Sequence, residues 1–166
     1  MDAPHSAWNV AHGLVWSAGR NPGKVAIREG PRALSYRALN GRVNRLANGL
    51  LGLGLGPGDR LLLLLGDRLE HLEALFAAAK VGIVAAPVDH RWREEEVRHA
   101  VELYEPRAVL YEEATRPLAP ALDGPRVCLE TEYEALLARA DESEALRPVP
   151  MEAPFAIAST SGTSGL

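Results

Sequence analysis

The stretch Arg60–Gly66, with the sequence RLLLLLG, constrains the fold of this chain more than any other segment. Its run of leucines leaves no polar face, so it does not fit a strand that has one side in water. A continuous apolar run of this length is typical of a strand covered on both faces, as in a parallel sheet between layers of helices. It therefore predicts an α/β fold with a buried parallel strand at Arg60–Leu65.

Two more apolar stretches repeat this pattern, and helical segments separate the three. Ile83–Val88 and Arg107–Glu112 are predicted strands, with predicted helices at 69–82 and 93–105 between them. The first helix should end at Gly82, a typical C-cap residue. Its expected buried face consists of Leu69, Leu72, Leu75, Phe76 and Ala79. This order predicts right-handed βαβ units, so we expect the three strands to be neighbours in one parallel sheet.

The N-terminal part predicts a β-hairpin followed by a long helix. The segment KVAIREGPRALSY, residues 24–36, has a turn signal at Gly30-Pro31. Ser35 is expected to be the N-cap of a helix that continues to residue 54. The expected buried face of this helix consists of Leu39, Val43, Leu46 and Leu50. The glycine- and proline-rich Gly54–Asp59 should then end the helix and turn the chain.

The C-terminal third carries shorter elements. Pro125–Glu130 and Phe155–Thr160 are further expected strands. A short helix is predicted at 131–140, with Thr131 as N-cap and Glu134 as its capping-box partner. The stretch Asp141–Pro154, acidic and then proline-rich, predicts a surface loop. We expect residues 1–166 to form a single α/β domain.

Composition narrows the function classes. The formal net charge of −4 at pH 7 argues against broad electrostatic binding to nucleic acid or to anionic lipid. The longest apolar run lies around Leu61–Leu65 and is far shorter than the ~20 residues that cross a bilayer. The N-terminus lacks the basic start and continuous apolar core of a signal peptide. These features predict a cytoplasmic protein without a membrane span.

Rare residue types add two expectations. Cys128 is the single cysteine, so no intramolecular disulfide can form, as is natural in a reducing compartment. It lies in an apolar stretch, and we expect an inert buried thiol, with a reactive thiol as the alternative. Lysine occurs only at Lys24 and Lys80, and glutamine is absent. This bias fits a thermophile, and a GC-rich genome would produce it as well.

Several binding motifs can be excluded. The glycines at Gly52–Gly58 do not have the G-x-G-x-x-G spacing, and they precede a strand where a dinucleotide site requires them to follow one. No segment matches the Walker A pattern. His71, His90 and His99 are scattered, so we expect no zinc site. The acidic run Glu94–Glu96 is predicted to be a solvated helix N-terminus rather than a catalytic pair.

The segment STSGTSG at residues 159–165 has two interpretations. Glycines let backbone N–H groups surround an anion, and Ser and Thr hydroxyls add donors, so a strand that runs into such a segment suits phosphate. By composition alone, a flexible linker is the alternative.

The wider sequence resembles a family that contains such a loop. Residues 160–166, TSGTSGL, resemble the start of the phosphate loop of the adenylate-forming superfamily, which includes acyl-CoA synthetases, luciferases and non-ribosomal peptide synthetase adenylation domains. The family pattern is roughly [ST]-S-G-[ST]-[ST]-G-x-P-K-G. The positions that match it are Thr160, Ser161, Gly162, Thr163, Ser164 and Gly165. Leu166 occupies the variable position, and Pro-Lys-Gly would come next.

The resemblance covers nearly the whole chain and is strongest to fatty-acid or acyl-CoA ligases. LSYRAL, LGLGPGDRLLLLL, HLEALFAAAKVGIVAAPV and RAVLY are similar to family segments in the family's order. Three places depart from the family pattern: Asp67 replaces a frequent Asn, Asp89-His90 replaces Asn-Pro, and Arg93-Glu94 replaces Thr-Pro. We expect all three to lie on loops.

The resemblance implies a reaction and its substrates. In the family, a carboxylic acid and ATP give an acyl-adenylate, and a thiol such as coenzyme A then forms a thioester. Thr160 to Gly165 would hold the β- and γ-phosphates, while the family's Mg²⁺, ribose, adenine and acyl sites lie further along the chain. We therefore expect an N-terminal segment truncated in the phosphate loop, inactive alone and without tight binding of ATP, Mg²⁺ or CoA. Its expected partners are the remainder of the synthetase or a second copy. The alternative is a non-catalytic α/β remnant that acts as a binding or self-association module.

Overall fold

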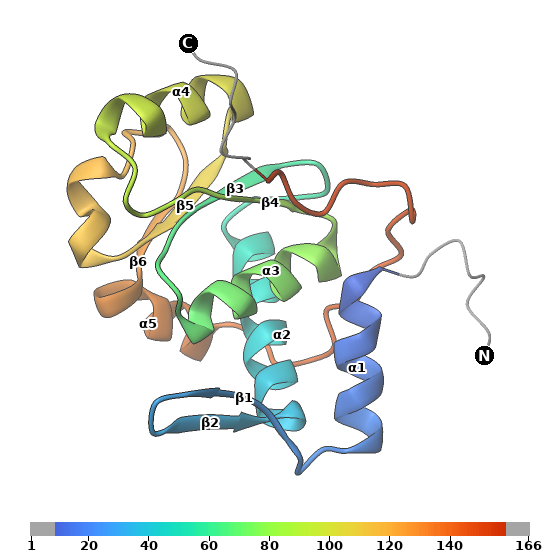
Figure 1. Ribbon diagram of the computed structural model, residues 1–166. Coiled ribbons are helices and arrows are strands. Elements are labelled where there is room, and N and C mark those ends of the chain that lie inside the picture. Colours follow the sequence, from blue (N-terminus) through green and yellow to red (C-terminus); the bar gives the residue numbers. More distant parts are fainter. Residues whose placement is uncertain (1–8, 159–166) are drawn as a thin grey trace.

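The structure is a computed structural model that describes residues 9–158. Its centre is a parallel sheet of four strands in the order β4-β3-β5-β6 (Figure 1). The strands are β3 (Arg60–Leu64), β4 (Val84–Pro87), β5 (Ala108–Tyr111) and β6 (Arg126–Cys128). Because β3 pairs in parallel with both β4 and β5, the predicted arrangement of the three apolar strands is confirmed.

Both faces of the sheet are buried, and this explains the leucine run. Leu61 and Leu63 belong to one apolar cluster, while Leu62 and Leu64 belong to a second cluster on the opposite face. Helices α2 (Tyr36–Gly52), α3 (Leu69–Val81) and α5 (Glu134–Arg139) cover the first face, and α4 (Glu94–Tyr104) covers the second (Figure 1). Successive side chains of a strand point to opposite faces, so a strand between two helical layers needs apolar residues at every position.

The N-terminal elements pack against the first of these clusters, to which helix α1 (Val10–Arg20) contributes Leu14. This helix contacts α2 and α3, and the antiparallel hairpin β1 (Val25–Glu29) and β2 (Arg32–Ser35) turns at Gly30, whose φ is +53°. The Ser35 hydroxyl oxygen accepts a hydrogen bond from the Ala38 N–H at 3.2 Å, so the expected N-cap is confirmed. The predicted apolar face of α2 is also confirmed, since its four residues are all buried: Leu39, Val43, Leu46 and Leu50.

The expected buried face of α3 is only partly correct. Leu69 and Ala79 are buried and Gly82 ends the helix with φ +76°, but Leu72, Leu75 and Phe76 are only partly covered. The fully buried residues of α3 include Ala74, Ala77, Ala78, Glu73 and Lys80. Helix α3 lies against α1, α2 and the sheet at once (Figure 1). Close approach favours alanine at these contacts, and the two charged side chains are buried because each has partners.

The helix predicted at 131–140 begins earlier and differently. β6 ends at Cys128, and a single π turn, Leu129–Tyr133, leads directly into α5. Thr131 therefore lies inside the π turn and is not an N-cap. The Cys128 backbone N–H donates to the Glu132 carboxylate at 2.8 Å, so a side chain from within the turn satisfies the start of the helix.

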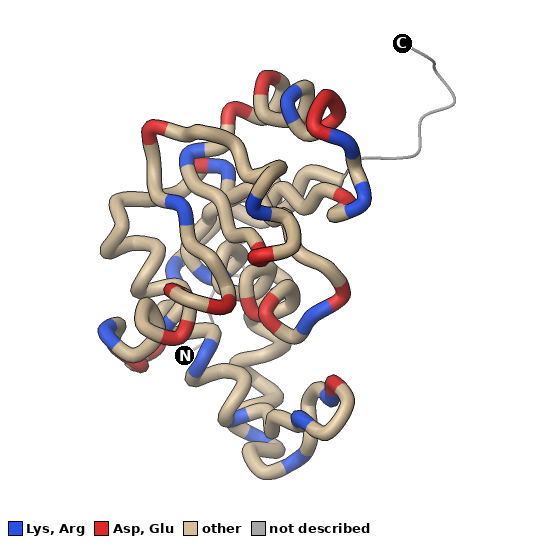
Figure 2. Tube along the Cα trace, turned by 90° about the vertical axis from the view of Figure 1, so that its left-hand side faces the viewer, with Lys and Arg blue, Asp and Glu red and all other residues tan. Residues whose placement is uncertain are grey.

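The expected surface loop Asp141–Pro154 is also more structured than predicted. Most of it is exposed, but Ala145 and Val149 are buried, and its first half is hydrogen-bonded to α2. Cys128 is fully buried, as expected. Within residues 9–158, no helix is long and apolar enough to span a bilayer. Acidic and basic residues are both spread over the described chain (Figure 2).

Candidate functional site

The loops that follow the four parallel strands meet at one edge of the sheet. This is the carboxyl edge, where open α/β sheets bind ligands. The departures from the family pattern lie here: Asp67 follows β3, and Asp89 and His90 follow β4. Asp67 and His90 are exposed loop residues, as expected. Arg93 and Glu94, by contrast, start α4, where the Arg93 N–H donates to the Glu96 carboxylate at 2.7 Å.

The segment before the predicted phosphate loop runs alongside β4. Ala156 pairs in parallel with Ala85. The Ala85 N–H donates to the Phe155 carbonyl oxygen at 2.9 Å, and the Ile157 N–H donates to the Ala85 carbonyl oxygen at 2.8 Å. Because this contact is parallel, the chain at Ile157 is heading toward the same carboxyl edge as β4.

The predicted strand Phe155–Thr160 is a single bridge in its described part. Its last two residues, and the predicted phosphate-binding residues Thr160, Ser161, Gly162, Thr163, Ser164 and Gly165, lie outside the described residues. Pro87 supplies a reason for the single bridge. Every second residue of β4 directs its backbone N–H and C=O groups toward this segment. Ala85 is one of these residues, and Pro87 is the next. Proline has no N–H to continue the ladder.

A polar network ties the other loops of the carboxyl edge together. The Glu112 carboxylate accepts from the Gly66 N–H at 3.1 Å. The Arg68 guanidinium reaches Glu130 at 2.7 Å, and Glu130 accepts from the Glu113 N–H at 2.9 Å. The loops after β3, β5 and β6 are therefore joined through two acidic side chains, Glu112 and Glu130, and one arginine, which makes this edge a fixed platform.

The charges of the platform are already paired. Burial lowers the pKa of Arg68, but its hydrogen bond to Glu130 and the charges of Glu70 and Glu112 outweigh burial and raise it. Beside β4, the hydrogen bond from Arg91 holds the pKa of Asp89 well below its usual range, and their closest nitrogen–oxygen distance is 2.6 Å. Both guanidinium groups are thus occupied by carboxylates and are not free to bind phosphate.

The described part of the chain contributes support rather than a complete binding site. Among residues 9–158, no three His, Cys, Asp or Glu side chains are grouped so that they could hold a metal ion. The sequence analysis missed the Arg68 network, because its members come from three separate loops and no local pattern links them. It also missed a group of Asn side chains on α2 that holds the Asp141–Pro154 loop. Their spacing of four residues, at Asn40, Asn44 and Asn48, was a signal available in the sequence.

CoA ligases are among the relatives that comparison with known sequences gives. The long-chain-fatty-acid–CoA ligase of Thermus thermophilus is 32% identical over 180 residues, an alignment that covers 100% of this chain and 33% of the relative. The indoleacetate–CoA ligase of Aromatoleum aromaticum is 35% identical over 161 residues, covering 89% of this chain and 31% of the relative. The chain thus spans about a third of the length of these ligases.

Solved structures agree in fold. An inhibitor-bound N-terminal domain of FACL13 from Mycobacterium tuberculosis superposes with a TM-score of 0.87 at 26% identity, covering 95% of this chain and 42% of that one. The anthranilate CoA ligase AuaEII, in complex with anthranoyl-AMP, gives a TM-score of 0.90 at 20% identity, covering 99% of this chain and 33% of that one. At that identity, the second match supports the fold alone.

A family model described as "AMP-binding enzyme" matches residues 14–166. Since this match extends over nearly the whole sequence, the chain belongs to the AMP-binding enzyme family.

Proposed function

We propose that this chain is the N-terminal part of an ATP-dependent acyl-CoA synthetase. The complete enzyme would join a carboxylic acid to AMP and release pyrophosphate, after which a thiol would attack the acyl carbon and displace AMP. The observation that carries the proposal is the parallel contact between Ala156 and Ala85, which leads the chain toward the carboxyl edge of the sheet three residues before the Ser/Thr/Gly segment begins.

The proposed role of residues 160–165 is to hold phosphate. The hydroxyls of Thr160, Ser161, Thr163 and Ser164 and the backbone N–H groups of Gly162 and Gly165 would donate to the β- and γ-phosphate oxygens. Mg²⁺, as in the family, would neutralise phosphate charge when bound. The chemical contribution of this segment would be positioning and charge stabilisation.

The acid substrate is proposed only as a class. Ligases named for long-chain fatty acids and for indoleacetate are both relatives of this chain. Because these relatives are named for such different acids, they support an acyl-CoA synthetase as a class.

The decisive experiment measures acid-dependent exchange between ATP and pyrophosphate in two proteins. One is the 166-residue chain, and the other is this chain continued by the downstream two thirds of the Thermus thermophilus ligase. We expect no exchange by the first protein and measurable exchange by the second, with circular dichroism to check that both are folded. Turnover by the short chain, or a folded but inactive long protein, would contradict the proposal.

Nucleotide affinity provides a second measurement on the short chain. A few charge-assisted hydrogen bonds, each worth about 1.5–3 kcal/mol, oppose about 4–15 kcal/mol for immobilising the ligand. We therefore expect a dissociation constant for Mg²⁺–ATP of roughly millimolar or weaker in an NMR titration. Saturation at micromolar ATP would mean that the short chain contains a complete nucleotide site.

A further inference from the structure

A segment without regular secondary structure is fixed along one face of α2. We call residues 141–149, which follow α5, the strap (Figure 1). Asn40, Asn44 and Asn48 are spaced by four residues and so lie on one face of α2. The Asn48 side-chain N–H₂ donates to the carbonyl oxygens of Asp141 at 2.9 Å and Ser143 at 3.1 Å. The Asn44 N–H₂ donates to the Glu142 carbonyl oxygen at 3.2 Å, so the strap runs antiparallel to the helix.

Lys80, in the last turn of α3, joins the strap to both helices. Its side chain is completely buried, and its ammonium group donates to the side-chain oxygens of Asn40 at 2.8 Å and Asn44 at 2.6 Å, and to the Glu144 carboxylate. An ammonium has three N–H donors, and these three acceptors use all of them. The Lys80 carbonyl oxygen also accepts from the Arg147 N–H at 2.9 Å. We call this arrangement the Lys80 clamp.

Burial and pairing oppose each other in the clamp. Burial lowers the pKa of Lys80 and outweighs its hydrogen bond and charge interaction with Glu144. Burial raises the pKa of Glu144, but the hydrogen bonds from Lys80 and Asn40 and the positive charge of Lys80 outweigh it and lower the pKa. Glu144 is therefore ionised at neutral pH. The Glu144 side chain keeps 41% of its surface exposed, so one end of the pair reaches water while the other is enclosed.

The clamp holds the chain at Glu144, before it continues to the edge of β4. Beyond the clamp, Val149 approaches Gly82 so closely that a Cβ on this glycine would lie 3.3 Å from a Val149 methyl group. The chain then reaches β4, where the bonds of Ala85 with Phe155 and Ile157 hold it again. Lys80 and Ala85 belong to the same α3–β4 unit. The chain from Glu144 to Ile157 is thus attached to this unit at two points, the clamp and Ala85, and Ser159 follows Ile157 by two residues.

We propose that Lys80 and Glu144 are positioning residues, which fix through the strap the point at the β4 edge where the Ser/Thr/Gly segment begins. The role of this segment in holding phosphate rests on the proposed function. The contacts of the clamp are independent of that function. An apolar side chain would serve the core as well, because a buried ion pair often contributes little net stability. A pair that joins three separate segments with directed hydrogen bonds is better suited to fixing their relative position.

The first test is amide hydrogen exchange on the 166-residue chain. Lys80→Met keeps the length of the side chain and removes its charge and donors. We expect exchange to become about tenfold faster at Ala145, Arg147 and Ile157, relative to the Val109 amide in the middle of the sheet. The matched control is Val97→Ala, a buried change on α4 away from the strap, which should leave these ratios unchanged.

If Lys80→Met does not fold, a less disruptive variant can be used to test the proposal. Glu144→Gln removes one charge from the exposed side of the clamp and should raise the same three ratios to a smaller extent. Uniform acceleration of all amides in both clamp variants would assign Lys80 and Glu144 a general stabilising role and overturn the proposal, as would ratios equal to those of the control.

The second test uses the long protein described above, which contains the downstream part of a ligase. A clamp variant should raise KM for ATP about tenfold, while Val97→Ala should leave it within about twofold. An unchanged KM for ATP in an active clamp variant would refute the positioning role. If the unmodified long protein is folded and inactive, the proposed function fails, whereas the exchange ratios still decide whether the clamp fixes the strap.

Discussion

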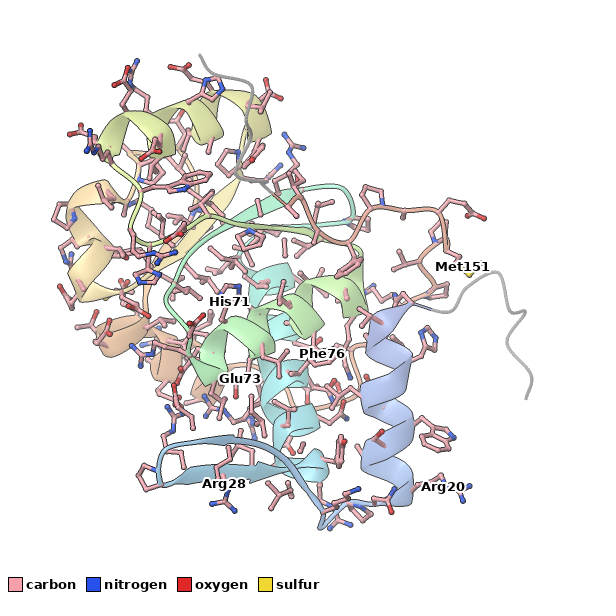
Figure 3. The ribbon with its side chains drawn as sticks, in the orientation of Figure 1. Arg20, Arg28, His71, Glu73, Phe76 and Met151 are labelled. Atoms are coloured by element: carbon pink, nitrogen blue, oxygen red, sulfur yellow. The ribbon has the colours of Figure 1, made fainter. Side chains whose placement is uncertain are left out.

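At the scale of single residues, buried charge is confined to side chains that are fully paired. Glu73, labelled on α3 in Figure 3, has no exposed surface. Its carboxylate accepts from the Tyr133 hydroxyl at 2.7 Å and from Arg42, whose Nη2 lies 3.1 Å away. Arg42 also reaches Glu134 at 2.7 Å. Burial, together with the charge of Glu73, raises the pKa of Tyr133 well above its usual value, so the hydroxyl stays protonated and keeps donating.

Removing the centre of this group should be costly. We expect Glu73→Ala to lower the free energy of unfolding by about 3 kcal/mol, because Arg42 and Tyr133 then lose a buried partner. Urea denaturation measures the effect. The matched control is Glu134→Ala, whose side chain is 65% exposed and should contribute about 1 kcal/mol or less. Equal losses in the two variants would contradict the assigned importance of Glu73.

At the scale of elements, the backbone conformation of one glycine sets the C-terminal end of α3. Gly82 ends α3 in the left-handed region, and its N–H donates to the Ala78 carbonyl oxygen. The tight connection places β4 directly after α3 and beside Pro57 and Val149. Glycine is favoured at position 82 for two reasons: its positive φ angle, and the close approach of Pro57 and Val149.

Alanine at two glycine positions should therefore have opposite effects. Gly82→Ala should destabilise the chain by about 1–2 kcal/mol, since a Cβ is disfavoured at φ +76°. Gly13→Ala, in the middle of α1 with no atom within 4 Å of the added Cβ, should stabilise it by about 0.5–1 kcal/mol. Thermal unfolding compares the two. A neutral Gly82→Ala variant would show that the turn can adopt another conformation.

At the scale of the whole molecule, ionised carboxylates hold separate segments together. Glu144 fixes the strap, and Glu130 joins two loops of the carboxyl edge. Burial raises the pKa of Glu130, but its hydrogen bonds, among them those with the Glu113 N–H and Arg68, lower it overall. The structure thus depends on several acidic groups whose folded-state pKa is depressed.

Acid should destabilise the chain for this reason. A depressed folded-state pKa contributes stability above the unfolded pKa, near 4.3 for Glu, and this stability is lost as the pH falls through the folded-state value. We expect the free energy of unfolding to be steady near neutral pH and to decrease below about pH 4. Urea titrations at a series of pH values measure this, and Glu144→Gln should give a shallower decrease. A stability that rises on acidification would contradict the assignment.

Exposed apolar side chains lead to a prediction about association. Leu103 is 66% exposed, Met151 59% and Trp16 57%. Exposed apolar surface of sufficient area tends to find a partner. We expect a dimer or larger oligomer at micromolar concentration, measured by light scattering. A monomer at high concentration would speak against self-association.

The sequence by itself determined the layered architecture. The unbroken leucine run required a strand covered on both faces, and the alternation with helices required parallel pairing, because each crossover returns the chain to the same end of the sheet. Local signals also determined the N-cap at Ser35 and the helix end at Gly82. These depend on neighbouring residues only, so a short window of sequence contains the required information.

Only the tertiary structure decided which polar residues are buried and what they hold. Glu73, Lys80 and Asn44 look like solvent-exposed positions in a helical pattern, yet their partners lie 31 to 101 residues away in the chain. The single bridge at Ala156 likewise depends on a non-local contact, with Ala85. Long-range pairing of polar groups has no period along a sequence, and only the folded chain brings Lys80, Asn44 and Glu144 together.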